Sequence, residues 1–270
     1  MLLSLGKLDQ MKKLLSILNL LSIVAIIYWN YLVATGFINN RDMAELSNNI
    51  NSLFTPANYA FSIWSIIYLM LTINAVWIVV KAFKGNRNKD FVSATIYLPL
   101  AHLASGLWLY FWQTEQYAVS VFCMLAIFLF LMVLIVKLNM QKWEAPASTI
   151  GLLWWPISLY SGWITAATVT NIAAYLKVND FQWLFSEATW TIIILVITTL
   201  VYLYMISSRY MRMYGAVGIW ALIAIAIRHI DTLPNIAYTA IACAVVIALI
   251  SAVQGFKYRK QNPFFQKLFG

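Results

Sequence analysis

Two apolar runs of this chain carry aromatic and hydrogen-bonding side chains at the spacing of one helix face. His102, Ser105 and Trp108 recur every three residues in one run, and Trp163 and Asn171 lie eight residues apart in another. Side chains three, four or seven to eight residues apart share a face of an α-helix. Aromatic walls with a few convergent polar groups are typical of a small-molecule site. We therefore interpret these faces as candidate walls of a ligand pocket.

A third candidate wall follows Pro56. Proline restricts its own backbone and that of the preceding residue, so a helix is expected to begin soon after it, with Asn58 as its N-cap. Phe61, Trp64 and Tyr68 then fall three and four residues apart and form an aromatic ladder. The alternative is that they are interfacial anchors and packing residues of a membrane helix.

Other kinds of chemistry lack a signature in the sequence. There is no Gly-rich phosphate loop, no pair of carboxylates within an apolar run and no His/Cys cluster with metal-ligand spacing. We expect no enzyme activity and no metal site. His102 is the one clearly intramembrane ionisable residue; it is either a hydrogen-bonded packing residue or a ligand, and its imidazole could bind a haem iron.

The amino-acid composition indicates whether these residues lie in water or in a membrane. Hydrophobic residues make up 63% of the 270 residues and charged residues only 10%, with a mean hydropathy of +0.78. Ordinary soluble domains carry about a quarter charged residues. The sequence therefore predicts an all-α integral membrane protein. Its expected transmembrane helices cover residues 14–35, 59–81, 92–112, 117–138, 149–176, 189–207, 215–227 and 236–255.

The charged residues predict an orientation. With the N-terminus inside and eight spans, 15 of the 18 Lys and Arg residues fall on the inner side. This is what the positive-inside rule requires, so the net charge of +9 indicates topology and not nucleic-acid binding. We expect a multi-pass protein of the cell membrane with both termini cytoplasmic. The candidate walls, and Asn30 of the first helix, then lie in the outer half of the bilayer, beneath the polar segment 37–58.

An aromatic belt at the membrane interface is the competing interpretation. It accounts well for Trp29, Trp112, Tyr117 and Trp183. It accounts less well for Trp163, which lies well inside its predicted helix, and it leaves the stacked Ser, Asn and His residues without a role.

Two motifs resemble the translocator protein / tryptophan-rich sensory protein family (TspO/MBR-related). Trp64 and Tyr68 match its W-x-x-x-Y after a Pro-containing loop, and the segment from Trp163 through Ala167 to Asn171 is similar to its W-x-x-x-A-T-x-x-N. The third helix departs from the family, because Ser105 occupies the position of the Asn in its N-x-x-W element. The resemblance covers about residues 14–177.

The resemblance implies a five-helix transmembrane bundle over residues 1–177 with loop 37–58 as a lid. Residues 178–270 then add three further transmembrane helices and a basic tail. It also implies a hydrophobic planar ligand such as a porphyrin or haem-type tetrapyrrole, and a homodimer as a family-level partner. A receptor is the first hypothesis, followed by a transporter of the same molecule and by a porphyrin-degrading enzyme. The expected ligand-binding residues are Asn30, Pro56, Asn58, Phe61, Trp64, Tyr68, His102, Ser105, Trp108, Tyr160, Trp163, Ala167 and Asn171.

Overall fold

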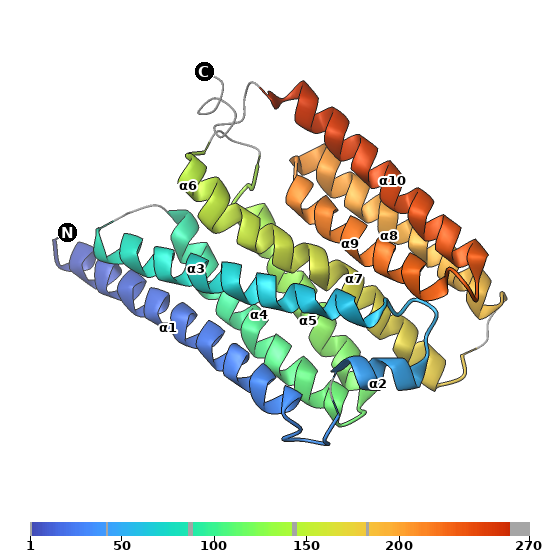
Figure 1. Ribbon diagram of the computed structural model, residues 1–270. Helices are drawn as coiled ribbons and strands as arrows, with labels where there is room; N and C mark the ends of the chain where they lie inside the picture. Colours follow the sequence, from blue (N-terminus) through green and yellow to red (C-terminus); the bar gives the residue numbers. More distant parts are fainter. Residues whose placement is uncertain (1, 42, 86–88, 142–144, 182–183, 260–270) are drawn as a thin grey trace. The chain divides into compact units, whose positions relative to one another are not determined.

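The computed structural model of the chain is all-helical (Figure 1). It describes every residue except 1, 42, 86–88, 142–144, 182–183 and 260–270. Each of the eight predicted helices is found in the described residues. They are α1 (Leu2–Ala34), α3 (Ile63–Phe83), α4 (Lys89–Gln113), α5 (Tyr117–Lys137), α7 (Trp155–Val178), α8 (Glu187–Arg209), α9 (Arg212–His229) and α10 (Pro234–Lys257).

Two segments expected outside helices are helical. The described residues before the first predicted helix (14–35) form the first part of α1, where Lys13 pairs with Asp9 one turn earlier at 2.7 Å. The predicted lid 37–58 contains the short helix α2 (Met43–Ile50), which buries Leu46 and Ser47. A helix of eight residues gives too weak a periodicity to be detected in a polar segment.

The predicted N-cap at Asn58 is wrong. The chain after Pro56 first forms a 3₁₀-helix, η1 (Asn58–Ser62), and its N-cap is Ala57, which makes no side-chain cap hydrogen bond. The Asn58 side-chain oxygen instead accepts a hydrogen bond from the Asn48 side-chain amide of α2, at 2.8 Å. A tertiary partner thus takes the oxygen that would have capped the helix.

The predicted helix 149–176 is one continuous helical segment with an irregular beginning. A single turn, α6 (Ala147–Thr149), is followed by the π-helix η2 (Ile150–Trp154) and then by α7. Pro156 is near the start of α7, where its missing N–H and its ring disturb the regular ladder of the preceding turn. A π-helical turn is one way for a helix to accommodate such a disturbance.

The chain folds into two compact units. Unit 1 comprises Met1–Asp42 and Trp64–Met140, and unit 2 comprises Met43–Ile63 and Gln141–Gly270. In unit 1, α4 packs against α1 and α5. The indole N–H of Trp29 on α1 donates to the carbonyl of Gly106 on α4 at 3.1 Å, which joins these two helices at a position without a side chain.

Unit 2 is built around α7. This helix packs against α8 and α9, and α10 covers α8 and α9. The hydroxyl of Tyr202 on α8 donates to the carbonyl of Gly162 at 2.9 Å, and Thr165 shares a hydrogen bond with Tyr214 of α9. Polar side chains of α7 therefore find partners inside the unit, as buried groups in an apolar setting must.

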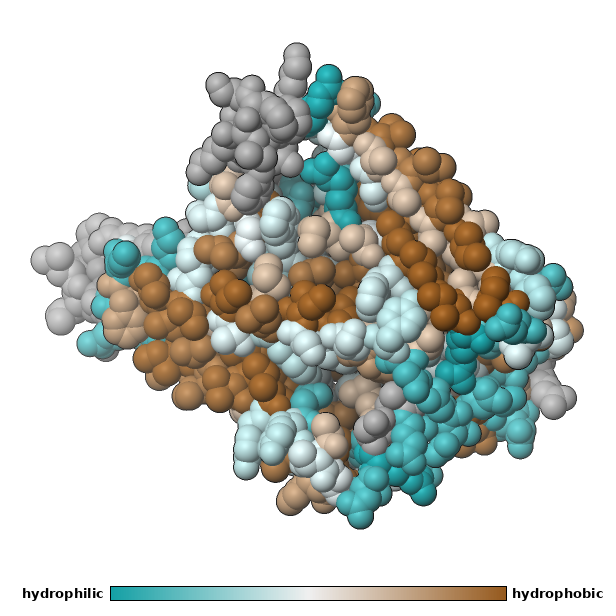
Figure 2. Space-filling model, in the orientation of Figure 1, coloured by the Kyte–Doolittle hydropathy of each residue, from teal (hydrophilic) through white to brown (hydrophobic). Residues whose placement is uncertain are grey.

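Within the described residues, six helical segments have the length and apolar composition to cross a bilayer. They are Asp9–Ala34, Asn58–Phe83, Val92–Gln113, Tyr117–Lys137, Glu187–Arg209 and Pro234–Lys257. Apolar side chains face outward on them; Figure 2 shows such residues along α10, where Ile241, Val245 and Leu249 are exposed. The two predicted spans missing from this set are α7, which is largely buried and rich in Ser and Thr, and α9, which carries Arg212 and Arg228.

Candidate functional site

Unit 1 contains a continuous series of aromatic rings in contact, here called the aromatic series: Tyr68, Trp64, Trp108, Trp112 and Tyr117. Trp64 stacks on Tyr68 at a centroid distance of 5.3 Å and on Trp108 at 6.5 Å. Trp108 stacks on Trp112 at 6.2 Å, and Trp112 meets the edge of Tyr117 at 5.3 Å. The series links α3, α4 and the start of α5. Each such pair contributes roughly 0.5–1.5 kcal/mol beyond its buried area.

Four rings of the aromatic series are buried and Tyr68 is half-buried, and two of the buried indoles lack a hydrogen-bond acceptor within the described structure. Trp64, Trp108 and Trp112 are 8%, 6% and 3% exposed. The indole N–H groups of Trp108 and Trp112 have no hydrogen-bond acceptor among the residues that the structure describes. Because a buried indole normally finds a partner for its N–H, these two donors are available to an acceptor atom of a ligand.

The predicted polar residues of unit 1 lie on the neighbouring helices. His102 and Ser105 are buried on α4, about two turns and one turn before Trp108, respectively. The His102 Nδ1 atom is 2.9 Å from the hydroxyl of Ser22 on α1. The side-chain amide of Asn30 donates to the carbonyl of Ile26 one turn earlier, at 2.9 Å, so part of its hydrogen-bonding capacity is used within α1.

The other predicted residues belong to unit 2. Phe61 meets the edge of Trp163 at a centroid distance of 6.1 Å, which joins η1 to α7. Tyr160, Asn171 and Pro56 are buried, and Ala167 is half-buried. Asn58 is exposed and is bound to Asn48. The structure thus groups the predicted residues into two sets, one within each unit.

Two of the four residues that an aromatic belt would explain are buried inside unit 1. Trp112 and Tyr117 are buried in the aromatic series and do not present their rings outward. Trp29 is half-buried with its N–H on Gly106, which is compatible with either role. Trp183 lies outside the described residues.

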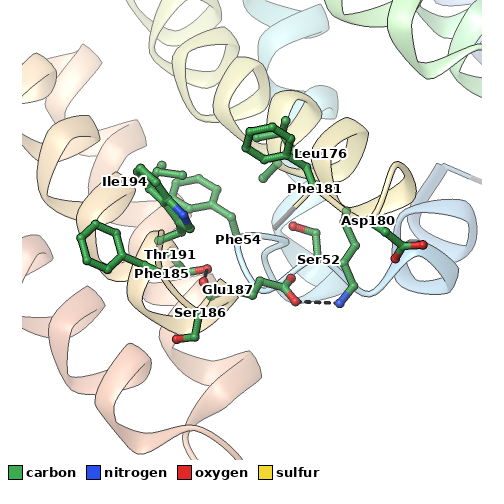
Figure 3. Close-up of a pocket in the computed structure, with 13 residues that line it drawn as sticks. Ser52, Phe54, Leu176, Asp180, Phe181, Phe185, Ser186, Glu187, Thr191 and Ile194 are labelled. Atoms are coloured by element: carbon green, nitrogen blue, oxygen red, sulfur yellow. Dashed lines mark hydrogen bonds and ion pairs between the residues drawn. The ribbon is translucent and has the colours of Figure 1, made fainter. Parts of the chain in front are cut away.

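Unit 2 also contains a cavity of about 590 Å³ that includes none of the predicted residues (Figure 3). Its wall combines the end of the predicted lid, the C-terminal turn of α7 and the first turns of α8. The lining residues are Ser52, Phe54, Ala173, Leu176, Lys177, Asp180, Phe181, Phe185, Ser186, Glu187, Trp190, Thr191 and Ile194. The sequence offered one hint, since Phe181, Phe185 and Trp190 accompany three charged residues in a short connection.

Hydrogen bonds hold the end of the lid in place. Glu187 accepts from the backbone N–H of Leu53 at 3.2 Å and pairs with Lys177 at 2.6 Å. His229 donates from Nε2 to the Leu53 carbonyl at 2.8 Å, and Arg228 donates to the Asn48 side chain at 2.7 Å. Burial lowers the pKa of His229, the hydrogen bond to Leu53 opposes this, and the positive charge of Arg228 lowers the pKa further.

Metal chemistry has no evident place in the described part of the chain. There, no group of three or more His, Cys, Asp or Glu side chains is placed to hold a metal ion. His102 would offer an imidazole to a haem-type ligand from the same face of α4 as Trp108. The Nδ1 atom of His102 already contacts the Ser22 hydroxyl.

The fold and the aromatic series define the class of this protein: it is an all-helical, multi-pass membrane protein with a buried tryptophan-rich cluster. The chain belongs to the TSPO-like protein family, whose sequence model matches residues 16–253. The match includes α8, α9 and most of α10, beyond the part of the chain that carries the two motifs. The domain division at residue 177 stays a prediction. Comparisons with curated proteins and with solved structures find no match.

Proposed function

We propose that this protein is a membrane receptor that binds a hydrophobic planar molecule such as a porphyrin against the aromatic series. The stacking of Trp64, Trp108 and Trp112 carries the proposal, because a group of stacked indole rings, inclined to one another by 27° and 29°, suits a flat aromatic ligand such as a tetrapyrrole. The unpaired indole N–H groups of Trp108 and Trp112 would donate to acceptor atoms at the rim of the ligand. Membership of the TSPO-like family supports the same ligand class.

The side chains of unit 1 would do this work: Trp64 and Trp108 would stack on the ligand, with Asn30, His102 and Ser105 as candidate polar groups. The predicted residues of unit 2, Trp163 and Asn171 among them, form a separate set, and their role in ligand binding stays a prediction. Asn58 is the weakest member of the predicted set, because it is exposed and its side-chain oxygen is occupied by Asn48.

The proposal is tested by quenching of tryptophan fluorescence with protoporphyrin IX on the protein in lipid nanodiscs. Replacing Trp64 with leucine should weaken protoporphyrin binding roughly two- to tenfold, the effect of losing one aromatic stacking contact of about 0.5–1.5 kcal/mol. The matched control is Trp77→Leu on the same helix, because Trp77 lies against Lys81 and outside the aromatic series. Equal affinity of the two variants would contradict the proposed site.

Counterflow distinguishes a receptor from the alternative, a transporter. No Asp or Glu lies inside a predicted span to couple transport to ions, so we expect binding without exchange. Proteoliposomes loaded with protoporphyrin would then show no accelerated uptake of labelled protoporphyrin. Accelerated uptake that is lost in Trp64→Leu would favour the transporter.

A further inference from the structure

The cavity of unit 2 has a composition that the aromatic series does not explain. Three charged side chains line it, two carboxylates (Asp180 and Glu187) and one ammonium (Lys177). Lys177 is paired with Glu187 at 2.6 Å, and both side chains of the pair are more than a third exposed. The cavity wall therefore carries a net charge of −1, and its one cation is already neutralised.

The remaining wall is mostly aromatic and aliphatic. Phe54 is fully buried at the back, whereas Phe181 and Phe185 are 56% and 51% exposed. The Phe185 ring meets the edge of Trp190 at a centroid distance of 5.5 Å. In the view of Figure 3, Phe54, Phe185 and Ile194 lie on one side of the cavity and Asp180 on the other, with Glu187 between them. The faces of aromatic rings attract cations, most strongly those of Trp.

We propose that this cavity binds an organic ammonium ion with an apolar body. The ammonium group lies at Glu187 and Asp180, and the apolar body lies against Phe54, Phe185 and Trp190. The volume of about 590 Å³ is within the range of small-molecule sites. An anionic ligand is disfavoured, because it would have to displace Glu187 from Lys177 while facing a second carboxylate.

Glu187 gives the site a link to the lid. Its two carboxylate oxygens accept from the Leu53 backbone N–H and from Lys177, so the same side chain contacts the lid, α7 and the cavity. A cation held at Glu187 adds a third partner without breaking either bond, since a carboxylate offers about four lone-pair positions. This site shares no residue with the aromatic series, so its test is independent of the test of the proposed porphyrin site.

Two probes of equal shape test the proposal on the unaltered protein. The first is N,N,N-trimethyl-2-(2-naphthyl)ethanaminium, and the second is its neutral carbon analogue, 2-(3,3-dimethylbutyl)naphthalene. Equilibrium dialysis against protein-containing and empty nanodiscs gives the protein-bound fraction of each. We expect the cation to bind at least about tenfold more tightly than the neutral analogue, as for a close charge pair. Equal or tighter binding of the neutral probe, or no saturable binding of the cation, would overturn the proposal.

Variants locate the cation. Glu187→Gln keeps an oxygen for Leu53 but removes the charge, and should weaken binding of the cation about tenfold with little change for the neutral probe. Trp190→Leu should weaken both probes several-fold, because Trp190 lies against the apolar body that the two probes share. The matched control is Glu115→Gln, which removes a partly exposed glutamate paired with Arg41 at 3.2 Å in unit 1. Cation affinity that is unchanged in Glu187→Gln, or lowered equally in Glu115→Gln, would place the cation elsewhere.

Discussion

Gly162 sets how closely α7 and α9 approach. A Cβ atom at this position would lie 3.0 Å from the Tyr214 carbonyl and 3.1 Å from the Val217 Cβ atom. The Gly162 carbonyl also accepts the hydroxyl of Tyr202 from α8. Small residues allow membrane helices to pack backbone against backbone, and the polar contacts in unit 2 depend on that approach.

Replacing Gly162 with alanine should therefore destabilise unit 2. The clash with the α9 backbone costs roughly 1–3 kcal/mol, which exceeds the gain of about 1 kcal/mol in helix propensity. Thermal unfolding in detergent should show a lowered midpoint. The matched control is Gly106→Ala on α4, where the new Cβ would meet Ile26 at 3.6 Å, an ordinary contact. This variant should keep or raise the midpoint; equal shifts in the two variants would argue against the close approach.

Interactions with α9 fix the segment between α2 and η1. The Ala57 backbone N–H donates to the Ala224 carbonyl at 3.1 Å, and the Trp220 indole donates to the Ala60 carbonyl at 3.1 Å. Arg228 and His229 at the end of α9 bind Asn48 and the Leu53 carbonyl. A segment that looks like a loop in sequence is thus held along much of its length by one helix.

Acid should loosen this segment through His229. Because its pKa is lowered below 6.5 in the fold, the folded protein holds the imidazole neutral where the unfolded chain already binds a proton. The resulting stabilisation is complete above about pH 6.5 and is lost as the pH falls through the lowered pKa. Hydrogen exchange of the amides of residues 52–60, corrected for the intrinsic rate, should show less protection at pH 5 than at pH 7.5.

His229→Gln separates the titration from the hydrogen bond. Glutamine retains an N–H donor for Leu53 but does not titrate, so the corrected protection of this variant should be nearly the same at both pH values. If the variant loses protection at pH 5 as the unaltered protein does, another group is responsible.

The low apolarity of α7 follows from where it lies. Ser158, Ser161, Thr165 and Asn171 are buried, and exposed large apolar side chains are confined to Val178 at its end. A helix that is surrounded by other helices does not need a lipid-facing apolar surface. We infer that α7 and α9 cross the bilayer together with the six strongly apolar segments, which gives eight crossings and places both termini on the same side of the membrane. The positive-inside rule predicts that this side is the cytoplasm.

Cysteine labelling tests this topology. In a background with Cys123 and Cys243 replaced by serine, Lys137→Cys reports the connection before α7 and Asn179→Cys the connection after it. Both native positions are exposed. If α7 crosses, a membrane-impermeant maleimide applied to whole cells should label Asn179→Cys and leave Lys137→Cys unlabelled until the cells are opened. The same accessibility for both sites would mean that α7 does not cross.

Much of this architecture is present in the sequence because the relevant signals are local. Apolar runs and charged connections predict the eight helices, and three-residue spacing predicts that His102, Ser105 and Trp108 share a buried face. Local patterns do not predict which residues of different helices and connections contact one another. The side-chain contact of Asn58 with Asn48, the packing of Phe61 on Trp163 and the cavity beside Glu187 all depend on how helices are rotated and shifted against one another. Those rotations are set by close contacts such as the one at Gly162. Such contacts involve several helices at once, so they produce no periodic pattern in the sequence of any one helix.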